Sequence, residues 1–456
     1  MQQIITAKLK LIATSEQQQL LRQTQLAYRD ALNYVSRYAF EHGKLSSERR
    51  IHKETYYDVR AQFKLPSEMT NNAIRQVATT YKGLWTKFKK NNEHRRAGYT
   101  KRRYKGLEAV TKYVSPTVTY NYGYDYSFKP EQRVSILTLQ GRVIVSYQGY
   151  NRHVTLIQNG ATIRAAKLWY DKPHKQFFLL VSLEIEVADL TPEVQQTVVG
   201  VDVGIRYLAT TTTMSNTSKF YPGKRVRARA DHYTRLRKRL QKKGTRSATR
   251  RMMAMKGRER RLKLQVNHSI AKSIVQAPPY TLIGLEELTG IRERTKRRSK
   301  RRKKHGNGFE PVSQKARRSN RHVSKWAFAE LQEMIAYKAI LSGSHVIKVD
   351  ADYTSQTCPL CGYTSKQNRP GKGLLFICQN KRCAYHSQTS HAYTLHADLI
   401  GARNIAMRTL LIRQDWVRTG VLSVRPDVSS DETKAARLAR YAELRWSLDT
   451  SPSFQG

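Results

Sequence analysis

The stretch VVGVDVGIR, residues 198–206, places an aspartate at the end of a short apolar run. The run before Asp202 is rich in valine and carries no charge, which is typical of a buried central strand. A carboxylate in such a strand is costly to bury unless it is paired or bound to a metal ion. Taken alone, the stretch predicts either a functional carboxylate or an ordinary turn aspartate.

Two later acids stand in comparable settings. Glu286 ends the apolar run YTLIGLE (280–286), and Asp398 lies at the start of an amphipathic helix predicted from about residue 397. Glu287 follows Glu286 directly, and side-chain alternation places the two on opposite faces of the strand. Three carboxylates in the order strand, strand, helix are hard oxygen ligands that suit Mg²⁺.

Four cysteines cluster within 26 residues of each other and precede the third acid. They are Cys358, Cys361, Cys378 and Cys383. A CxxC pair and a CxxxxC pair separated by a short hairpin suit a closed, structural Zn²⁺ site, and their clustering favours metal binding over disulfides. The second spacing departs from the commoner CxxC, so His386 or His391 remains an alternative ligand.

The charge of the chain indicates a polyanionic partner. Its 456 residues include 83 Lys and Arg against 34 Asp and Glu, a formal net charge of +49. This surplus predicts an extended contact with nucleic acid. A ribosomal-type basic protein would explain the charge but not the acids. We find no secretory signal and no run as long as a membrane span, and expect a cytoplasmic protein without membrane contact.

The N-terminal part predicts a β-barrel with inserted helices. Residues 4–13 form a first expected strand, and the segment 107–187 is rich in Val, Tyr, Thr and Phe with regular turn signals. Between them we expect a helix from an N-cap at Ser15 to about His42, and a second over residues 67–90.

The segment between the first two acids predicts a long helical pair over residues 226–243 and 248–276. Its outward faces are strongly basic and are expected to bind phosphates. The residues assigned to this contact are Arg235, Lys238 and Arg239. A second basic stretch, residues 292–304, lacks apolar periodicity and predicts a loop on nucleic acid. Its assigned residues are Arg297, Arg298 and Arg301. The polar tail after residue 413 predicts no function.

Three acids in this order around a four-cysteine cluster resemble the RuvC-like nuclease of TnpB, the transposon-encoded RNA-guided endonuclease, and of the related small type V CRISPR effectors. The resemblance runs from about residue 198 to 408. It implies an α+β multidomain fold: an RNase H-like (RuvC) nuclease core with an inserted zinc ribbon, and an N-terminal β-barrel (wedge) with an inserted helical recognition domain. The implied domains are the wedge at 1–13 and 107–190, the recognition domain at 14–106, the nuclease at 196–353 and 392–412, the zinc ribbon at 354–391 and the tail at 413–456.

The resemblance also implies a reaction. Two Mg²⁺ ions on Asp202, Glu286 and Asp398 would cut DNA, and the family pattern selects Glu286 over Glu287. A guide RNA pairs with the target strand of double-stranded DNA, while protein side chains recognise a short flanking motif. Residues 354–356 fit the family pattern, and their hydroxyls either line the site or cap a turn. A monomer in the RNA complex is expected.

The family places flanking-motif recognition in the N-terminal region, which directs attention to the helix over residues 67–90. Asn72, Gln76 and Thr79 share one helical face, and amide side chains can pair with adenine edges in the major groove. Lys82 would hold a neighbouring phosphate. The alternative is that these residues are ordinary solvent-facing polar side chains.

Three other hypotheses compete with a TnpB-like nuclease. A compact type V CRISPR effector shares all the motifs, although the length favours the transposon form. A guide-loaded DNA-binding repressor without cleavage would be expected to lose one or more of the acids, which are all present. A transposase that joins strands without RNA would be expected to carry a Tyr or Ser recombinase signature, and we recognise none.

Overall fold

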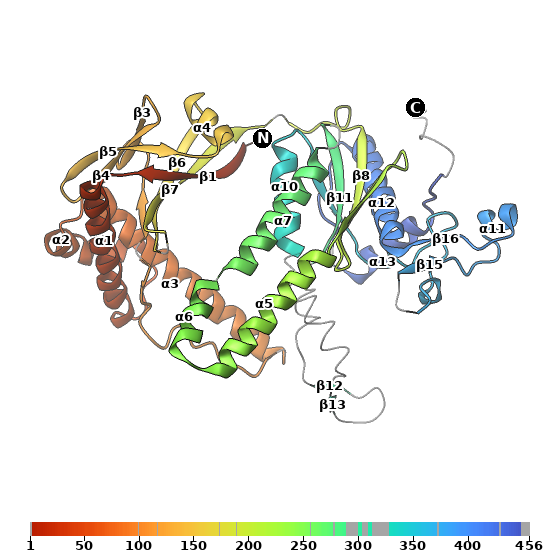
Figure 1. Cartoon of the computed structure of the whole chain (residues 1–456), viewed down its shortest axis with the longest axis horizontal. Helices are drawn as coiled ribbons and strands as arrows, with labels where there is room; N and C mark the ends of the chain where they lie inside the picture. Colours follow the sequence, from red (N-terminus) through yellow and green to blue (C-terminus); the bar gives the residue numbers. More distant parts are fainter. Residues whose placement is uncertain are drawn as a thin grey trace. The chain divides into compact units, whose positions relative to one another are not determined.

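The computed structural model describes residues 2–447 apart from 99, 116, 173, 188, 256, 277–278, 289–299, 303–308, 312–327, 372–373 and 428–429. The chain forms two compact units, Met1–Glu186 and Val187–Gly456, with an α+β composition (Figure 1). Within the described part of the chain, no helix combines the length and apolar character needed to cross a membrane.

The first unit is built on a seven-stranded sheet in the order β2-β6-β7-β1-β5-β4-β3, with antiparallel pairing throughout. The strands are β1 (Gln2–Ile12), β2 (Thr117–Tyr120), β3 (Tyr126–Lys129), β4 (Arg133–Thr138), β5 (Gly141–Gln148), β6 (Thr162–Asp171) and β7 (Gln176–Glu186). The Tyr126 hydroxyl donates a 2.6 Å hydrogen bond to the Arg164 carbonyl, which joins β3 to β6 and shows that the sheet curls on itself.

The predicted insertion of helices between the first strand and the later strands is confirmed. β1 pairs with β7 from Gln2 to Lys10 and with β5 from Lys10 to Ile12. The helices that follow β1 are α1 (Ser15–Glu41), α2 (Glu48–Phe63) and α3 (Ser67–Arg96). They pack against one another, and α1 and α3 also contact β2.

Three details of this unit differ from the prediction. The N-cap of α1 is Thr14 rather than Ser15, because Thr14 and Gln17 form a reciprocal capping box. Helix α2 was not predicted, since only Ile51, Thr55 and Val59 are buried on an otherwise polar helix. Helix α4 (Asn151–Gln158) interrupts the block predicted as strands only.

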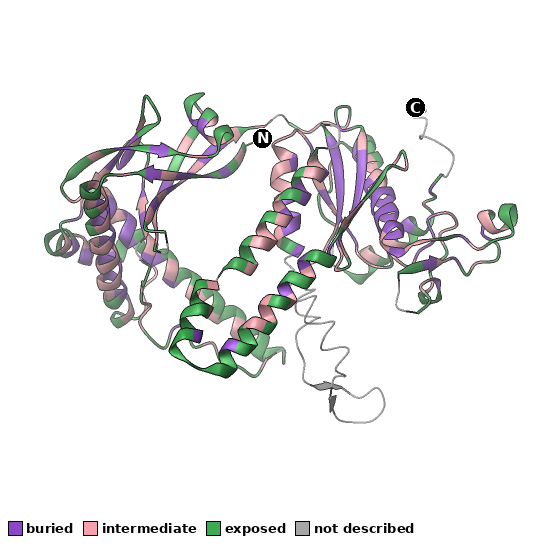
Figure 2. Cartoon of the chain, in the orientation of Figure 1, coloured by how far each residue is buried: buried purple, intermediate pink, exposed green. Residues whose placement is uncertain are grey.

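The second unit is organised around a five-stranded sheet in the order β10-β9-β8-β11-β14. The strands are β8 (Thr197–Asp202), β9 (Tyr207–Thr213), β10 (Ser218–Pro222), β11 (Thr281–Glu286) and β14 (His345–Val349). β8, β9 and β10 are antiparallel, whereas β11 runs parallel to both β8 and β14. β8 and β11 are buried almost throughout (Figure 2), as their sequences, uncharged up to the terminal acid, predict.

Alternation along β8 and β11 supplies two cores. Val199 and Ile283 pack with α7 (Arg258–Val275) and α10 (Phe328–Ile340), whereas Val198 and Leu282 pack with α12 (Ala397–Thr419). Glycines occupy two positions on the α12 side. A Cβ added at Gly200 would lie 2.5 Å from the Ala406 backbone nitrogen, so this residue permits close approach of the helix to the sheet.

The helical pair between β10 and β11 differs in one respect from the prediction. Helix α5 (Lys224–Lys243) agrees with it, but the predicted second helix consists of α6 (Arg246–Met255) and α7. Gly257, with φ of +83°, lies between them in the left-handed region and interrupts the helix. Residues 300–302 and 309–311 form the small hairpin of β12 (Lys300–Arg302) and β13 (Phe309–Pro311).

The C-terminal region after residue 413, for which the sequence predicts no function, contains folded segments. α12 continues to Thr419, and helix α13 (Asp431–Ala442) follows. Tyr441 and Trp446 are 6% and 4% exposed, so two large aromatic side chains anchor this segment to the second unit. Tyr441 is the one buried residue of α13, and the helix carries many charges, so its sequence signal is weak. The cysteine-containing segment between β14 and α12 holds η1 (Lys366–Asn368), β15 (Leu375–Ile377), α11 (Ala384–Thr389) and β16 (Thr394–His396).

Candidate active site and metal centre

The three predicted acids meet at one edge of the five-stranded sheet. Asp202 and Glu286 end the neighbouring parallel strands β8 and β11, whose register pairs Val201 with Leu285. Asp398 lies in the first turn of α12, which crosses the same edge. A Cβ added at Gly401 of α12 would lie 3.1 Å from the Asp202 carboxylate carbon. The helix therefore brings its N-terminal turn onto the strand that carries Asp202.

The electrostatics of the acids reflect this convergence. Burial raises the pKa of Asp202 well above its ordinary value, and the charges of Glu286 and Asp398 raise it further. Burial also raises the pKa of Glu286 and of Asp398. Such a group of mutually repelling, half-buried carboxylates is stabilised by cations, and so it is a candidate site for a divalent metal ion.

The structure distinguishes Glu286 from its neighbour Glu287. The Thr354 hydroxyl donates a 2.5 Å hydrogen bond to Glu286 Oε1, and it also contacts the Ala351 carbonyl. Glu287 instead lies close to Lys348. The negative charge of Glu287 raises the pKa of Lys348, although burial, the larger effect, lowers it. Glu286 is thus the acid beside Asp202, and Thr354 both lines the site and stabilises a turn.

Sequence reasoning missed two arginines of this site. The charge of Arg369 opposes the pKa rise of Asp202 and Asp398, and its guanidinium donates a 2.7 Å hydrogen bond to Ser355 Oγ. Arg408, 3% exposed on α12, acts in the same way on Glu286. Nothing in the sequence distinguishes Arg369 from the many other basic residues. Arg408 could have been noticed, because an arginine on the buried face of a helix is unusual.

The acids fit a divalent cation by donor chemistry. Among the described residues, the four cysteines are the one group of three or more metal-ligating side chains whose ligand atoms all lie within 4.8 Å of one another. The three carboxylates do not form such a group. Mg²⁺ binds oxygen at about 2.0–2.1 Å, so ligands of one ion lie within roughly 4.2 Å, but ligands of two ions about 3.5–4 Å apart can be more widely spaced.

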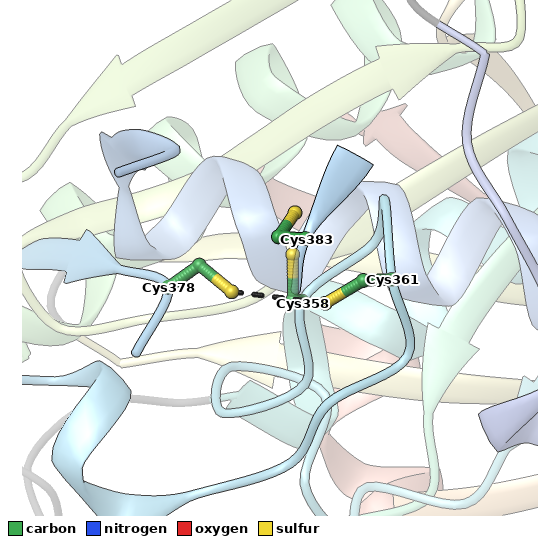
Figure 3. A group of neighbouring side chains, drawn as sticks. All are labelled: Cys358, Cys361, Cys378 and Cys383. Atoms are coloured by element: carbon green, nitrogen blue, oxygen red, sulfur yellow. Dashed lines mark hydrogen bonds between the residues drawn. The ribbon is translucent and has the colours of Figure 1, made fainter. Parts of the chain in front are cut away.

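The cysteines form a compact metal-binding centre (Figure 3). Cys358 and Cys361 come from the turn after β14, Cys378 directly follows β15, and Cys383 is the N-cap of α11. The sulfur atoms of Cys361 and Cys378 are 3.7 Å apart. Zn–S bonds of about 2.3 Å in a tetrahedron place sulfur atoms roughly 3.8 Å apart.

A polar side chain beside this centre also suits thiolates. Asn380 Nδ2 lies 3.5 Å from the Cys361 sulfur and can donate to it. Neither histidine considered as an alternative ligand, His386 or His391, belongs to the group of four. The residues therefore fit a four-coordinate metal ion without either histidine.

The proposed flanking-motif face of α3 is wrong in one residue. Asn72 is 4% exposed, and its amide contacts Asp125, Asn121 and the Thr119 carbonyl. Asn72 is therefore a structural side chain. The helix face that it shares with Gln76 and Thr79 is buried near the N-terminal end of α3. Gln76 is half-buried and accepts a 3.3 Å hydrogen bond from Tyr28. Thr79 and Lys82 are exposed.

The basic residues assigned on α5 lie at the surface. Arg235, Lys238 and Arg239 are exposed. Other residues of α5 line a cavity of about 620 Å³ together with α6 and the start of α7. The charged and aromatic residues lining it are Arg229, His232, Tyr233, Arg251 and Arg258. Arg297 and Arg298 lie outside the described residues. Arg301 belongs to β12, but its side chain is likewise outside the described part.

Two family models match the second unit and the end of the first. Residues 181–289 match the model described as "Probable transposase" (OrfB_IS605), and residues 328–405 match the Cas12f1-like TNB domain. The first match includes Asp202 and Glu286. The second includes the cysteines and Asp398.

Several relatives share these regions. InsQ of Escherichia coli K12, named an RNA-guided DNA endonuclease, is 25% identical over 65% of this chain and 70% of its own length. A TnpB-like protein of Methanocaldococcus jannaschii is 30% identical over 33% of this chain and 49% of its own length.

A CRISPR-associated endodeoxyribonuclease Cas12f1 of Sulfoacidibacillus thermotolerans is 39% identical over 19% of this chain. The matched region spans only 18% of the length of that protein. The chain is therefore related in sequence to the TnpB-like proteins, and its residues 181–289 and 328–405 match a probable-transposase model and a Cas12f1-like TNB model.

Proposed function

We propose that this protein is an RNA-guided, Mg²⁺-dependent DNA endonuclease of the TnpB type. The observation that carries the proposal is the meeting of Asp202, Glu286 and Asp398 at one sheet edge. Support also comes from the order of the strands across the second sheet. When its five strands are numbered from 1 to 5 along the chain, the order is 3-2-1-4-5, and strands 4 and 5 run parallel to strand 1. This is the order expected for the RNase H-like core of a RuvC nuclease. The relationship to InsQ supports the guided reaction.

The residues of the site have separable roles in this proposal. Bound Mg²⁺ ions would polarise the scissile phosphate and activate water. Asp202, Glu286 and Asp398 would hold those ions, and Thr354 fixes the rotamer of Glu286 through its 2.5 Å hydrogen bond. Arg369 places a positive charge beside Asp202 and Asp398, where the phosphate would lie.

The four cysteines would bind one structural Zn²⁺ ion and so form the predicted zinc ribbon. The ribbon segment leads directly through β16 into α12, and its residues Phe376 and Ile377 pair with Leu395 and Thr394. Folding of this segment around zinc would therefore fix the start of the helix that carries Asp398.

Nucleic-acid partners follow from the charge. A guide RNA and double-stranded target DNA would neutralise the +49 chain, with Arg235, Lys238 and Arg239 on phosphates. Gln76, Thr79 and Lys82 remain the proposed contacts to the flanking motif. The Cas12f1-like match at residues 328–405 favours a compact type V effector as the second candidate, with the same cleavage chemistry. The similarity to prokaryotic proteins supports the proposal of a cytoplasmic reaction.

The test uses protein purified with its co-expressed RNA. A discrete RNA with a constant scaffold and a variable end is expected, and a matching DNA target should be cut only with Mg²⁺. Asp202→Ala, Glu286→Ala and Asp398→Ala should each abolish cleavage and retain target binding, whereas Glu287→Ala, the matched control, should retain most activity. Copurification of bulk cellular RNA only, or cleavage by Glu286→Ala but not by Glu287→Ala, would contradict the proposal.

A further inference from the structure

The C-terminal segment, residues 420–447, makes a set of buried polar contacts with the candidate nuclease site. We propose that Arg437, Tyr441 and Trp446 of this segment are positioning residues, which hold Arg408 beside Glu286 and hold the first cysteine pair against the sheet. This inference rests on the proposed nuclease function, which it deepens by assigning a role to a segment outside both matched family regions.

The first contact fixes Asp350, which directly follows β14. Arg437 approaches its carboxylate with both arms, Nε at 3.0 Å from Oδ2 and the terminal nitrogen at 3.3 Å from Oδ1. The Tyr441 hydroxyl donates a 3.3 Å hydrogen bond to Oδ2. Asp350 is 5% exposed, so it depends on these partners for its charge to be stable in the interior.

The second contact links residues 350 and 352 to Arg408 of α12, which lies near the candidate active site. Arg408 donates hydrogen bonds of 2.5 Å to the Asp350 carbonyl and 2.9 Å to the Asp352 carbonyl. Its guanidinium lies 4.5 Å from the centre of the Tyr441 ring. The positive charge of Arg408 also lowers the pKa of Glu286 against the larger effect of burial. Arg408 is thus held between Tyr441 of α13 and the backbone of residues 350–352, and Thr354, two residues further on, donates to Glu286.

The third contact reaches the cysteine centre. The Trp446 backbone nitrogen donates a 2.8 Å hydrogen bond to the carbonyl of Pro359, which lies between Cys358 and Cys361. The Trp446 indole donates a 2.8 Å hydrogen bond to Asn216 Oδ1, at the β9–β10 turn. Trp446 therefore ties the first cysteine pair to the sheet that carries Asp202.

Simple packing does not account for this arrangement. A segment that served only to cover the core would bury apolar side chains alone, whereas this one also directs a guanidinium and a hydroxyl at Asp350 and an indole NH at Asn216. Buried polar groups of this kind define one geometry more sharply than apolar contacts do, because each has few alternative partners.

The experiment compares Arg437→Gln with Arg440→Gln, a control on the same helix whose guanidinium pairs with the more exposed Asp415. Cleavage rates at saturating target should fall about 10- to 100-fold in Arg437→Gln, as expected for a residue that orients a metal-site group. Target binding should stay within about twofold, and Arg440→Gln should match the wild type in both. Arg437→Lys, which keeps the charge but not the two-armed contact, should recover part of the rate.

A second readout does not need cleavage. Zinc release to a chromogenic chelator should be several-fold faster from Trp446→Ala and from Asn216→Ala than from the wild type or Arg440→Gln. If the wild type does not cut DNA, the proposed function fails, but zinc release still tests whether Trp446 holds the first cysteine pair against the sheet. The inference is overturned if Arg437→Gln cuts at the wild-type rate, if its losses of binding and cleavage are equal, or if Trp446→Ala releases zinc at the wild-type rate.

Discussion

Gly200 is the position where a single added methyl group should separate the proposed catalytic helix from the sheet. A Cβ there would lie 2.5 Å from the Ala406 backbone nitrogen and 2.8 Å from the Ala406 Cβ, with the Ala402 carbonyl closer still. Ordinary van der Waals contact begins at 3.4 Å, so the gap must open by about 0.9 Å at the nitrogen. The obstructing atoms belong mainly to the backbone of α12 and cannot rotate aside.

The expected cost of Gly200→Ala follows from that geometry. Overpacking of a core costs about 1–3 kcal/mol, and a clash with helix backbone belongs at the upper end of this range. For a unit of this size about 3 kcal/mol corresponds to a Tm lower by about 6–12 °C. Asp398 begins the same helix, so a shift of about 1 Å at the site should also lower cleavage about 100-fold.

The assay is thermal unfolding of the full-length protein combined with guided DNA cleavage. Gly83→Ala in α3 is the matched control, because no atom lies within 4 Å of its added Cβ, and it should stabilise by up to about 1 kcal/mol. Gly284→Ala should have a smaller effect than Gly200→Ala, because its obstructing atoms belong to the side chains of Thr409 and Ile405. A Gly200→Ala protein that unfolds and cleaves like the wild type would refute the close helix–sheet contact.

Three further outcomes are expected. Removal of zinc by a chelator, or Cys358→Ser, should expose the ribbon segment to proteolysis and lower cleavage with it; metal analysis that finds no zinc in the purified protein would oppose this. Asn72→Ala should lower Tm without changing flank preference, whereas Lys82→Ala should weaken cleavage of all flanks and reduce the salt slope of binding by about one, as randomised-flank cleavage and binding titrations can measure. Burial raises the pKa of Asp125 to about 6, above its unfolded value. The stability that its protonation contributes is therefore greatest below about pH 4 and is lost as pH rises through 6. Asp125→Asn should remove this component from a plot of Tm against pH, and a pH profile unchanged by the substitution would contradict it.

Local patterns in the sequence were sufficient to predict the candidate metal-binding residues of the second unit. An apolar run that ends in an acid is visible in the one-dimensional chain, because a buried strand excludes charge everywhere except at its end. The cysteine pairs are likewise local, and the four sulfurs assemble without a histidine. The two-residue period of a strand placed Glu286 and Glu287 on opposite faces, and the resemblance to the TnpB family selected Glu286.

Contacts between distant segments depended on tertiary structure. Asn72 had the spacing expected of a base-reading side chain, yet Asp125 and Asn121, about fifty residues away, bury it. Arg369 gained its place beside the acids from the folding of the cysteine segment.

The C-terminal segment shows the same division. Sequence alone determined the order of acids, the cysteine centre and the basic character, since strand and metal-ligand patterns are encoded over a few residues. Tertiary structure alone decided that Arg437 and Tyr441 meet Asp350, 87 and 91 residues earlier. A polar helix carries no local signal for a distant buried partner, because such a partner exists only after the sheet has formed.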